Sequence, residues 1–166
     1  NMKIKSNRIM MQDGEKAGVL TVENGKITAF DENGTAPDAE DFGNQRIIPG
    51  IFDTHNHGTC GFGMLGGEAS HEQHIASVKG YLKGLASQGT VNIFPTVMDV
   101  ESIRAVAEVA KQGIPGGATI LGIHSEGPWL NRTGEKGIRT GWPDVSMGTA
   151  QAMVQAGEGL LRLVAL

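Results

Sequence analysis

Short alternating runs of apolar and polar residues, separated by polar turns, occupy the first part of the chain. Residues 2–11 form one run and residues 18–23 form a second. Asn24-Gly25 is a strong signal for a tight hairpin, and residues 26–31 continue as the partner strand. Residues 2–46 therefore predict a small antiparallel β unit.

The pattern changes after Arg46 to strand-like and helix-like segments in alternation. Apolar residues recur at helical spacing in three segments, over residues 71–87, 99–112 and 146–156. Short apolar, β-rich runs precede and follow them, at residues 47–53, 91–95, 118–124 and 160–166. Parallel strands joined by helical crossovers give this alternation, so we expect a βα barrel or a doubly wound sheet.

The ends of the first two predicted helices carry their own signals. Ser70 is a candidate N-cap, and Gln73 stands at the position of its capping-box partner. Gly89 and Gly113 follow the last helical residues, which is where glycine ends helices most often. These signals predict helices that begin near residue 71 and end before each glycine.

Composition and charge narrow the class of protein. Hydrophobic residues make up 39% of the chain and charged residues 19%, which is typical of globular domains. We find no apolar run of the roughly 18 residues that a membrane helix needs, and no secretory signal. The net charge of −4 without a basic stripe argues against nucleic acid as a partner. The single Cys60 fits a reducing compartment, so we expect a cytoplasmic protein.

The chain is short for the architecture that its pattern indicates. A closed eight-stranded barrel takes about 200 residues or more, whereas the whole chain has 166. We therefore expect the N-terminal portion of a longer protein, with the remainder of its own chain as a partner.

Candidate metal ligands follow the first and third strands of the alternating region. His55 and His57 are two residues apart, so in an extended chain both imidazoles project to one side. Glu126 lies just past the third predicted strand, at the same rim of a parallel sheet. Spacing alone leaves a second interpretation open, in which these are solvated loop residues. His124 is either a second-shell donor or a packed strand-end residue, and Asp53 either orients a histidine or caps the backbone.

Two longer motifs carry a family resemblance. The segment Pro49-Gly-Ile-Phe-Asp-Thr-His-Asn-His57 resembles the opening strand of the amidohydrolase superfamily, whose signature is Pro-Gly-x-x-Asp-x-His-x-His. Within that superfamily, Gly122-Ile-His-Ser-Glu-Gly-Pro-Trp-Leu-Asn131 followed by Lys136-Gly137 is similar to the N-acetylglucosamine-6-phosphate deacetylase family. The resemblance implies an α/β fold, with residues 47–166 as the first βα units of an incomplete TIM-like (β/α)8 metal-dependent hydrolase barrel. Residues 2–46 would then be the N-terminal part of a small β-sandwich domain.

The resemblance also implies a site and a reaction. Glu126 would bind the metal shared by all members, and His55 and His57 a second metal found in some, so we expect one or two divalent ions, Zn or Fe. Backbone near Gly137 and Ile138 would contact an amino-sugar 6-phosphate, from which the enzyme removes the N-acetyl group. The general acid would be an aspartate beyond Leu166, so no catalytic residue is expected here and the segment alone would be inactive. The complete protein would be a homodimer.

Alternatives remain open at this stage. Ile138-Arg139 departs from the family, in which a small residue and a histidine are usual, so the sugar is undecided. An N-acetylgalactosamine-6-phosphate deacetylase, a D-aminoacylase-like enzyme or a cyclic amidase would share the metal motif. A non-catalytic metal-binding protein is the alternative from another class. Cys60 has no role in the family and is interpreted as a small loop residue.

Overall fold

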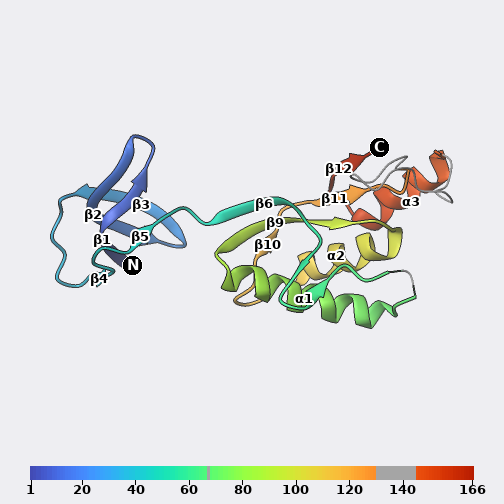
Figure 1. Ribbon diagram of the computed structural model, residues 1–166, viewed down its shortest axis with the longest axis horizontal. Helices are drawn as coiled ribbons and strands as arrows, with labels where there is room; N and C mark the ends of the chain where they lie inside the picture. Colours follow the sequence, from blue (N-terminus) through green and yellow to red (C-terminus); the bar gives the residue numbers. More distant parts are fainter. Residues whose placement is uncertain (67, 130–144) are drawn as a thin grey trace. The chain divides into compact units, whose positions relative to one another are not determined.

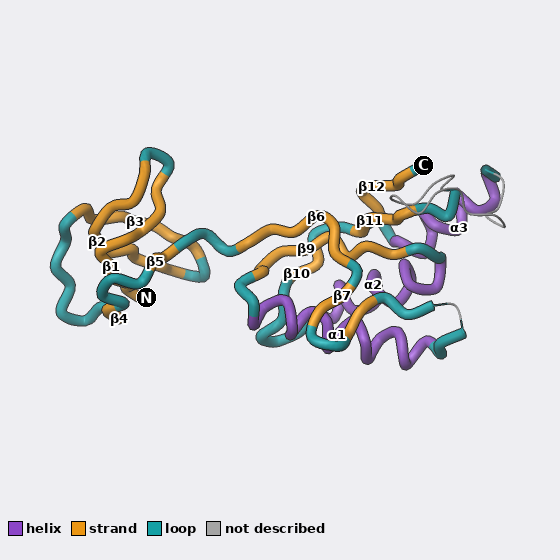
Figure 2. Tube along the Cα trace, in the orientation of Figure 1, coloured by secondary structure: helices purple, strands orange, loops and turns teal. Residues whose placement is uncertain are grey.

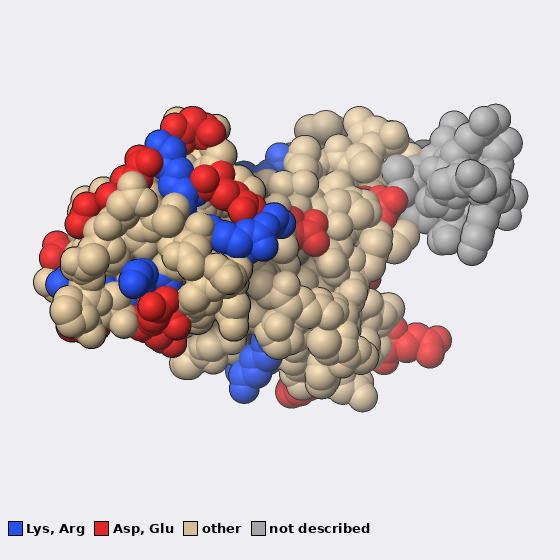
Figure 3. Space-filling model, turned by 60° about the vertical axis from the view of Figure 1, so that its left-hand side comes forward, with Lys and Arg blue, Asp and Glu red and all other residues tan. Residues whose placement is uncertain are grey.

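The computed structural model describes residues 1–66, 68–129 and 145–166 of the chain. The protein divides into two compact units, Asn1–Pro49 and Gly50–Leu166, and each is described by itself below (Figure 1). Acidic and basic side chains are interspersed on the face shown in Figure 3, in keeping with the small net charge. Across the helices that the structure describes, none combines the length and apolarity needed to cross a membrane.

The first unit is one small sheet. Strands β1 (Met2–Met11), β2 (Gly14–Glu23) and β3 (Lys26–Glu32) form an antiparallel meander in the order β3-β2-β1. Short strands β4 (Glu40–Asp41) and β5 (Arg46–Ile47) pair in parallel with β1. The hairpin at Asn24-Gly25 is confirmed, because both residues have the positive φ, 51° and 75°, of a tight primed turn.

Parallel strands form the sheet of the second unit. Its strands are β6 (Ile51–Asn56), β9 (Thr90–Val97), β10 (Thr119–Ile120), β11 (Ile123–Glu126) and β12 (Leu161–Ala165). Strand β9 is central: β6 pairs with it on one side, and β10 and β11 pair with it on the other. Strand β12 then pairs with β11. This register brings the carboxyl ends of β6, β9 and β11 to one rim.

The helices described in this unit are α1 (His71–Ser87), α2 (Val100–Gln112) and α3 (Met147–Gly157). Figures 1 and 2 show α1 and α2 side by side along one face of the strands. The core between helices and sheet is mostly aliphatic but also contains Tyr81, and its fully buried members include Val78, Leu82, Ile93, Val106 and Ile123. The first helix matches the predicted residues 71–87, and its capping box of Ser70 and Gln73 is confirmed.

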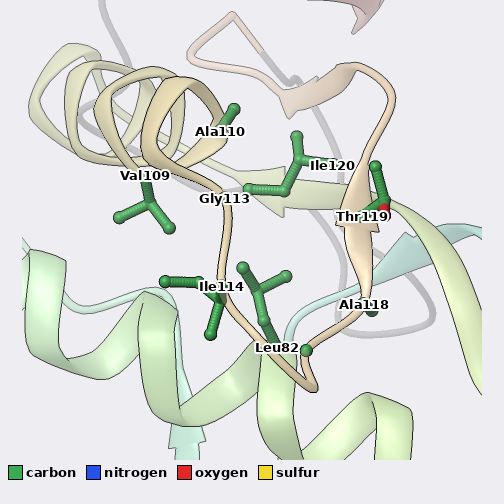
Figure 4. A pocket seen from close by; sticks show the side chains of 9 residues that line it. Leu82, Val109, Ala110, Gly113, Ile114, Ala118, Thr119 and Ile120 are labelled. Atoms are coloured by element: carbon green, nitrogen blue, oxygen red, sulfur yellow. The ribbon is translucent and has the colours of Figure 1, made fainter.

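A small cavity remains at one end of this core, with a volume of about 60 Å³ (Figure 4). It lies between α1, the end of α2 and β10, and its lining includes Leu82, Val109, Ile114 and Ile120. Because no titratable side chain lines it, this cavity is a packing feature rather than a candidate site.

The segment between β6 and α1 contains a short hairpin. Strands β7 (Gly58–Thr59) and β8 (Phe62–Gly63) pair antiparallel, with the turn at Cys60-Gly61. A Cβ added at Gly80 of α1 would lie 2.5 Å from the Phe62 ring, so the hairpin packs directly on that helix. The close approach explains the glycine, which sequence spacing alone could not do.

The strand expected at residues 118–124 is wrong in its bounds, because two strands stand there and the second continues to Glu126. Between them the chain changes partner: Leu121 N donates to Ile93 O at 3.1 Å, and Ile123 N donates to Leu160 O at 2.7 Å. A Cβ at Gly122 would lie 2.5 Å from the Arg162 side chain, so glycine permits the crossing. Strand β6 likewise runs past residue 53 to Asn56, and His55 is therefore inside the strand.

Candidate metal centre

His55, His57 and Glu126 converge at the carboxyl rim of the second unit's sheet. The Nε2 atoms of His57 and His55 lie 2.8 Å and 3.9 Å from Glu126 Oε2. Each residue offers one ligand atom, and these three atoms all lie within 4.8 Å of one another. The imidazoles are about half exposed, whereas 27% of the Glu126 side chain is accessible. The site is thus open enough for an ion or a small ligand to reach.

The donor set fits a divalent transition metal. Two imidazole nitrogens and a carboxylate oxygen are ligands that zinc and iron both accept. Ligands about 2.1 Å from one tetrahedral ion lie roughly 3.4 Å from each other. The Nε2–Oε2 separations of 2.8 Å and 3.9 Å fall on either side of that value, so small side-chain adjustments would suffice.

Strand alternation brings Glu126 to the site. Along β11, Ile123 and Ser125 are buried, whereas His124 and Glu126 lie on the opposite face and are partly exposed. The Ser125 hydroxyl donates to Gly127 O at 2.8 Å, where the chain leaves the strand. The core packing of Ile123 and Ser125 thereby fixes the side of the sheet on which the carboxylate stands.

Asn56, between the two histidines, is held by hydrogen bonds on every side. Its backbone N donates to Thr96 Oγ1 at 2.9 Å, and its carbonyl accepts from the Tyr81 hydroxyl at 3.1 Å. Its side-chain Nδ2 donates to Asp53 Oδ2 at 3.2 Å, and its Oδ1 accepts from Gly58 N at 2.9 Å. With the intervening residue fixed in this way, His55 and His57 leave the strand in defined directions.

Sequence reasoning did not identify this support. The helical stripe that contains Val78 and Leu85 also places Tyr81 in the core, which is a signal for burial. No local signal indicates that its hydroxyl meets the backbone of a residue 25 positions earlier. Burial, and to a smaller extent the charge of Asp53, raise the pKa of Tyr81 well above its usual value.

The structure shows different contacts for Asp53 and His124, the two residues for which the sequence left alternative roles. Asp53 caps the backbone, because its Oδ1 accepts from His55 N at 3.0 Å. His124 has its Nδ1 3.1 Å from Thr54 O, and its ring packs edge to face against His55 with centroids 4.9 Å apart. Cys60 is exposed, and its sulfur lies 3.7 Å from Thr59 Oγ1 rather than in the metal-ligand group. The substrate contacts expected at Gly137 and Ile138 lie outside the described residues.

The chain is similar in sequence to known deacetylases. No protein-family model matches it. The N-acetylglucosamine-6-phosphate deacetylase of Vibrio furnissii is 29% identical over 129 residues, which are 70% of this chain and 32% of the relative. The Danio rerio protein of that name is 30% identical over 137 residues, 77% of this chain and 32% of the relative. The chain therefore spans about a third of the length of these curated relatives.

Solved structures resemble the chain over nearly its whole length. An N-acetyl-D-glucosamine-6-phosphate deacetylase from Mycobacterium smegmatis superposes with a TM-score of 0.73 at 23% identity, covering 99% of this chain and 46% of that one. A mutant of the M. smegmatis enzyme, in complex with N-acetyl-D-glucosamine-6-phosphate, gives 0.72 at 22% identity, covering 98% and 42%. The Pasteurella multocida deacetylase gives 0.69 at 17% identity, covering 99% and 45%. The expected fold, a small β unit followed by the first part of a TIM-like barrel, is confirmed.

Proposed function

The chain is related by sequence and fold to the N-terminal portion of the N-acetylglucosamine-6-phosphate deacetylase family, and from this premise we propose that the intact protein is a metal-dependent deacetylase. Its reaction is hydrolysis of the N-acetyl amide of an amino-sugar 6-phosphate, with N-acetylglucosamine 6-phosphate as the first substrate to test. The products are the free amino sugar phosphate and acetate.

The convergence of His55, His57 and Glu126 is the observation that carries this proposal. In it, the three side chains hold one divalent ion, or Glu126 holds a first ion and the histidine pair a second. Such an ion supplies Lewis-acid chemistry, polarising a carbonyl and acidifying water at neutral pH. Zinc and iron both suit the donor set.

The chain's own residues contribute charge and geometry in this proposal. The Glu126 carboxylate would offset part of the charge of a bound cation, and the two imidazoles would bind the cation without adding negative charge. The hydrogen bonds from Tyr81 and to Thr96 hold Asn56, so the histidines between which it stands are oriented before substrate binds. The proton for the departing amine comes, in our proposal, from an acid outside residues 1–166.

We also propose that the remainder of the chain completes the barrel against the two edges of the sheet. Strands β6 and β12 stand at those edges, and both carry large exposed apolar side chains. Ile51 and Phe52 of β6 are 46% and 48% exposed, and Leu163 and Val164 of β12 are 44% and 39% exposed. Further parallel strands would pair with the backbones of these edges, and the helices that connect them would cover the apolar side chains. The homodimer expected for the complete protein stays a prediction.

Acetate release by the intact protein tests the function. We expect release from N-acetylglucosamine 6-phosphate, loss of release after treatment with a chelator, and recovery when zinc or iron is added. The galactosamine epimer, offered in parallel, decides the sugar. Hydrolysis of an N-acyl amino acid or a cyclic amide instead of either sugar phosphate would contradict the proposal and favour another amidohydrolase.

A further inference from the structure

His124 lies beside the metal centre without being one of its three clustered ligands. It stands two residues before Glu126 on β11 and on the same face of the strand. The ligand atoms that fall within 4.8 Å of one another, among the described residues, come from His55, His57 and Glu126. His124 is instead engaged with the strand that carries His55.

The hydrogen bond of His124 determines which of its two ring nitrogens carries the hydrogen. Nδ1 lies 3.1 Å from the Thr54 carbonyl oxygen. A carbonyl oxygen can only accept, so Nδ1 must carry the hydrogen and donate it. A neutral ring in this contact is therefore the Nδ1–H tautomer.

The contact joins two strands that are not hydrogen-bonded neighbours. Strands β6 and β11 pair with opposite sides of β9, and His124 is itself paired with Thr96 of that central strand. From this position the imidazole reaches across β9 to the Thr54 carbonyl, a contact between residues 70 positions apart. It thereby couples the strand that carries Glu126 to the strand that carries His55.

The same ring also touches a ligand directly. The centroids of His124 and His55 are 4.9 Å apart, with the planes inclined at 69°. His55 and His57 are related similarly, at 5.0 Å and 85°. Thr54 is the residue before His55, so His124 constrains both the peptide that leads into His55 and the ring of His55 itself.

We propose that His124 is a positioning residue of the metal centre, one that orients His55 through the Thr54 carbonyl and through ring packing. This inference rests on the proposed function, because it assumes that His55, His57 and Glu126 bind a metal. It goes beyond that function by assigning a task to a histidine that is not a ligand. Outer groups that orient ligand histidines commonly account for a 10- to 100-fold effect on metal affinity.

Zinc affinity of the intact protein tests the proposal, measured by competition with a chelator on wild type and three variants. We expect His124→Leu to weaken zinc binding by about 10- to 100-fold. His124→Asn should bind within a few-fold of wild type, because its amide can donate to the Thr54 carbonyl from near the Nδ1 position. His71→Leu, which removes an imidazole on α1, is the matched control and should bind as wild type does. Circular dichroism melts establish that each variant is folded.

Two outcomes among the variants would overturn the positioning role. Unchanged affinity in His124→Leu would mean that the ring is only packed at the strand end. Equal, severe loss in both His124→Leu and His124→Asn, with a changed visible spectrum of the Co²⁺-loaded chain, would make His124 a ligand instead. Failure of the wild-type chain to bind zinc or Co²⁺ at all would refute the metal centre, and this is distinguishable from the other two results.

A measurement on the wild-type chain keeps the inference testable if His124→Leu does not fold. Nitrogen-15 chemical shifts of the imidazole rings report which nitrogen carries the hydrogen. We expect His124 as the Nδ1–H tautomer both before and after zinc is added, while the shifts of His55 and His57 move. A hydrogen on Nε2 alone would contradict the contact with Thr54 and overturn the proposal.

Discussion

The buried Tyr81 hydroxyl donates a hydrogen bond of 3.1 Å to the backbone carbonyl of Asn56, the residue between the two histidines of the candidate metal centre. Tyr81→Phe keeps the ring and its packing but leaves that carbonyl without its donor. A buried acceptor that loses its partner costs about 1–3 kcal/mol. We expect the free energy of unfolding to fall by that amount in urea titrations, with a several-fold loss of zinc affinity.

Ser87→Ala is the matched control for this prediction. It removes another hydroxyl of α1 that donates to a carbonyl, that of Gly84 at 2.7 Å, away from the histidines. Zinc affinity should stay at the wild-type value in the control. Equal zinc affinity in Tyr81→Phe and wild type would show that the hydroxyl stabilises the fold without orienting the ligands.

Tyr81 also predicts how the protein behaves at high pH. Burial first, and then the negative charge of Asp53, raise its pKa above the 10.0 of an ordinary tyrosine. The folded state therefore retains a proton that the unfolded state loses, so this contribution to stability is present below pH 10 and is lost as the pH rises further. Because the chain has a single tyrosine, tyrosinate absorbance reports on this residue alone. We expect it to appear together with unfolding, and ionisation near pH 10 in the folded state would contradict the burial.

Local signals in the sequence predicted the elements but not their contacts. The helix over His71–Ser87 and its capping box of Ser70 and Gln73 depend on neighbours within one helical turn, so spacing is sufficient to predict them. The change of strand partner at Gly122 depends on Phe94 and Arg162, which are far away in the sequence. Without those partners, one strand at residues 118–124 was the natural prediction.

In the candidate site, too, the sequence predicted the local features but not the contacts between distant residues. The i, i+2 spacing of His55 and His57 predicted imidazoles on one side, and the structure brings both to Glu126. Their role as metal ligands stays a prediction. Asp53 lies on the same side of the strand as the histidines, so the sequence allowed it either to orient a histidine or to cap the backbone. Only the structure shows that its Oδ1 accepts from the backbone N–H of His55. Partners such as Tyr81 required the tertiary structure, because two-residue periodicity says nothing about a helix packed behind the strand.

Metal binding itself predicts a gain in stability. A ligand that binds only the folded state at 100 times its Kd adds about 2.7 kcal/mol to the free energy of unfolding. We expect zinc at that excess to produce this gain in the wild-type chain, measured by urea titration. Glu126→Gln removes the anionic ligand and should lose most of the gain at the same zinc concentration. Glu40→Gln, which neutralises an exposed carboxylate of β4, should retain it, and a gain of equal size in Glu126→Gln would exclude Glu126 as a ligand.

A histidine of α1 that contacts two glutamates of α2 predicts a dependence of stability on pH. His71 Nδ1 lies 2.6 Å from Glu101 Oε1, and His71 Nε2 lies 2.8 Å from Glu108 Oε2. A protonated imidazole donates to both carboxylates and joins the start of α1 to two turns of α2. Two further charged groups are close to this contact. Arg104 pairs with Glu101, and the carboxylate of Glu72, next to His71 on α1, interacts with the charge of His71.

The two carboxylates determine the direction of the effect. Hydrogen bonds to Glu108 first and then to Glu101 raise the pKa of His71 above the ordinary 6.5, outweighing desolvation. The positive end of the helix dipole at α1 acts in the opposite sense. A raised pKa means that the folded state binds a proton more tightly than the unfolded chain. The resulting stability is fully present below pH 6.5 and is lost as the pH rises through the folded pKa.

Urea unfolding of wild type and His71→Gln at a series of pH values checks this prediction. The other four histidines of the chain are common to both proteins, so the informative quantity is the difference between the two proteins. We expect wild type to lose its stability advantage over the variant as the pH rises above 6.5, because neutral His71 can donate to only one carboxylate. A difference that is constant with pH would mean that His71 is not charged in the folded protein. High salt should reduce the advantage only partly, since direct hydrogen bonds are screened less than distant charges.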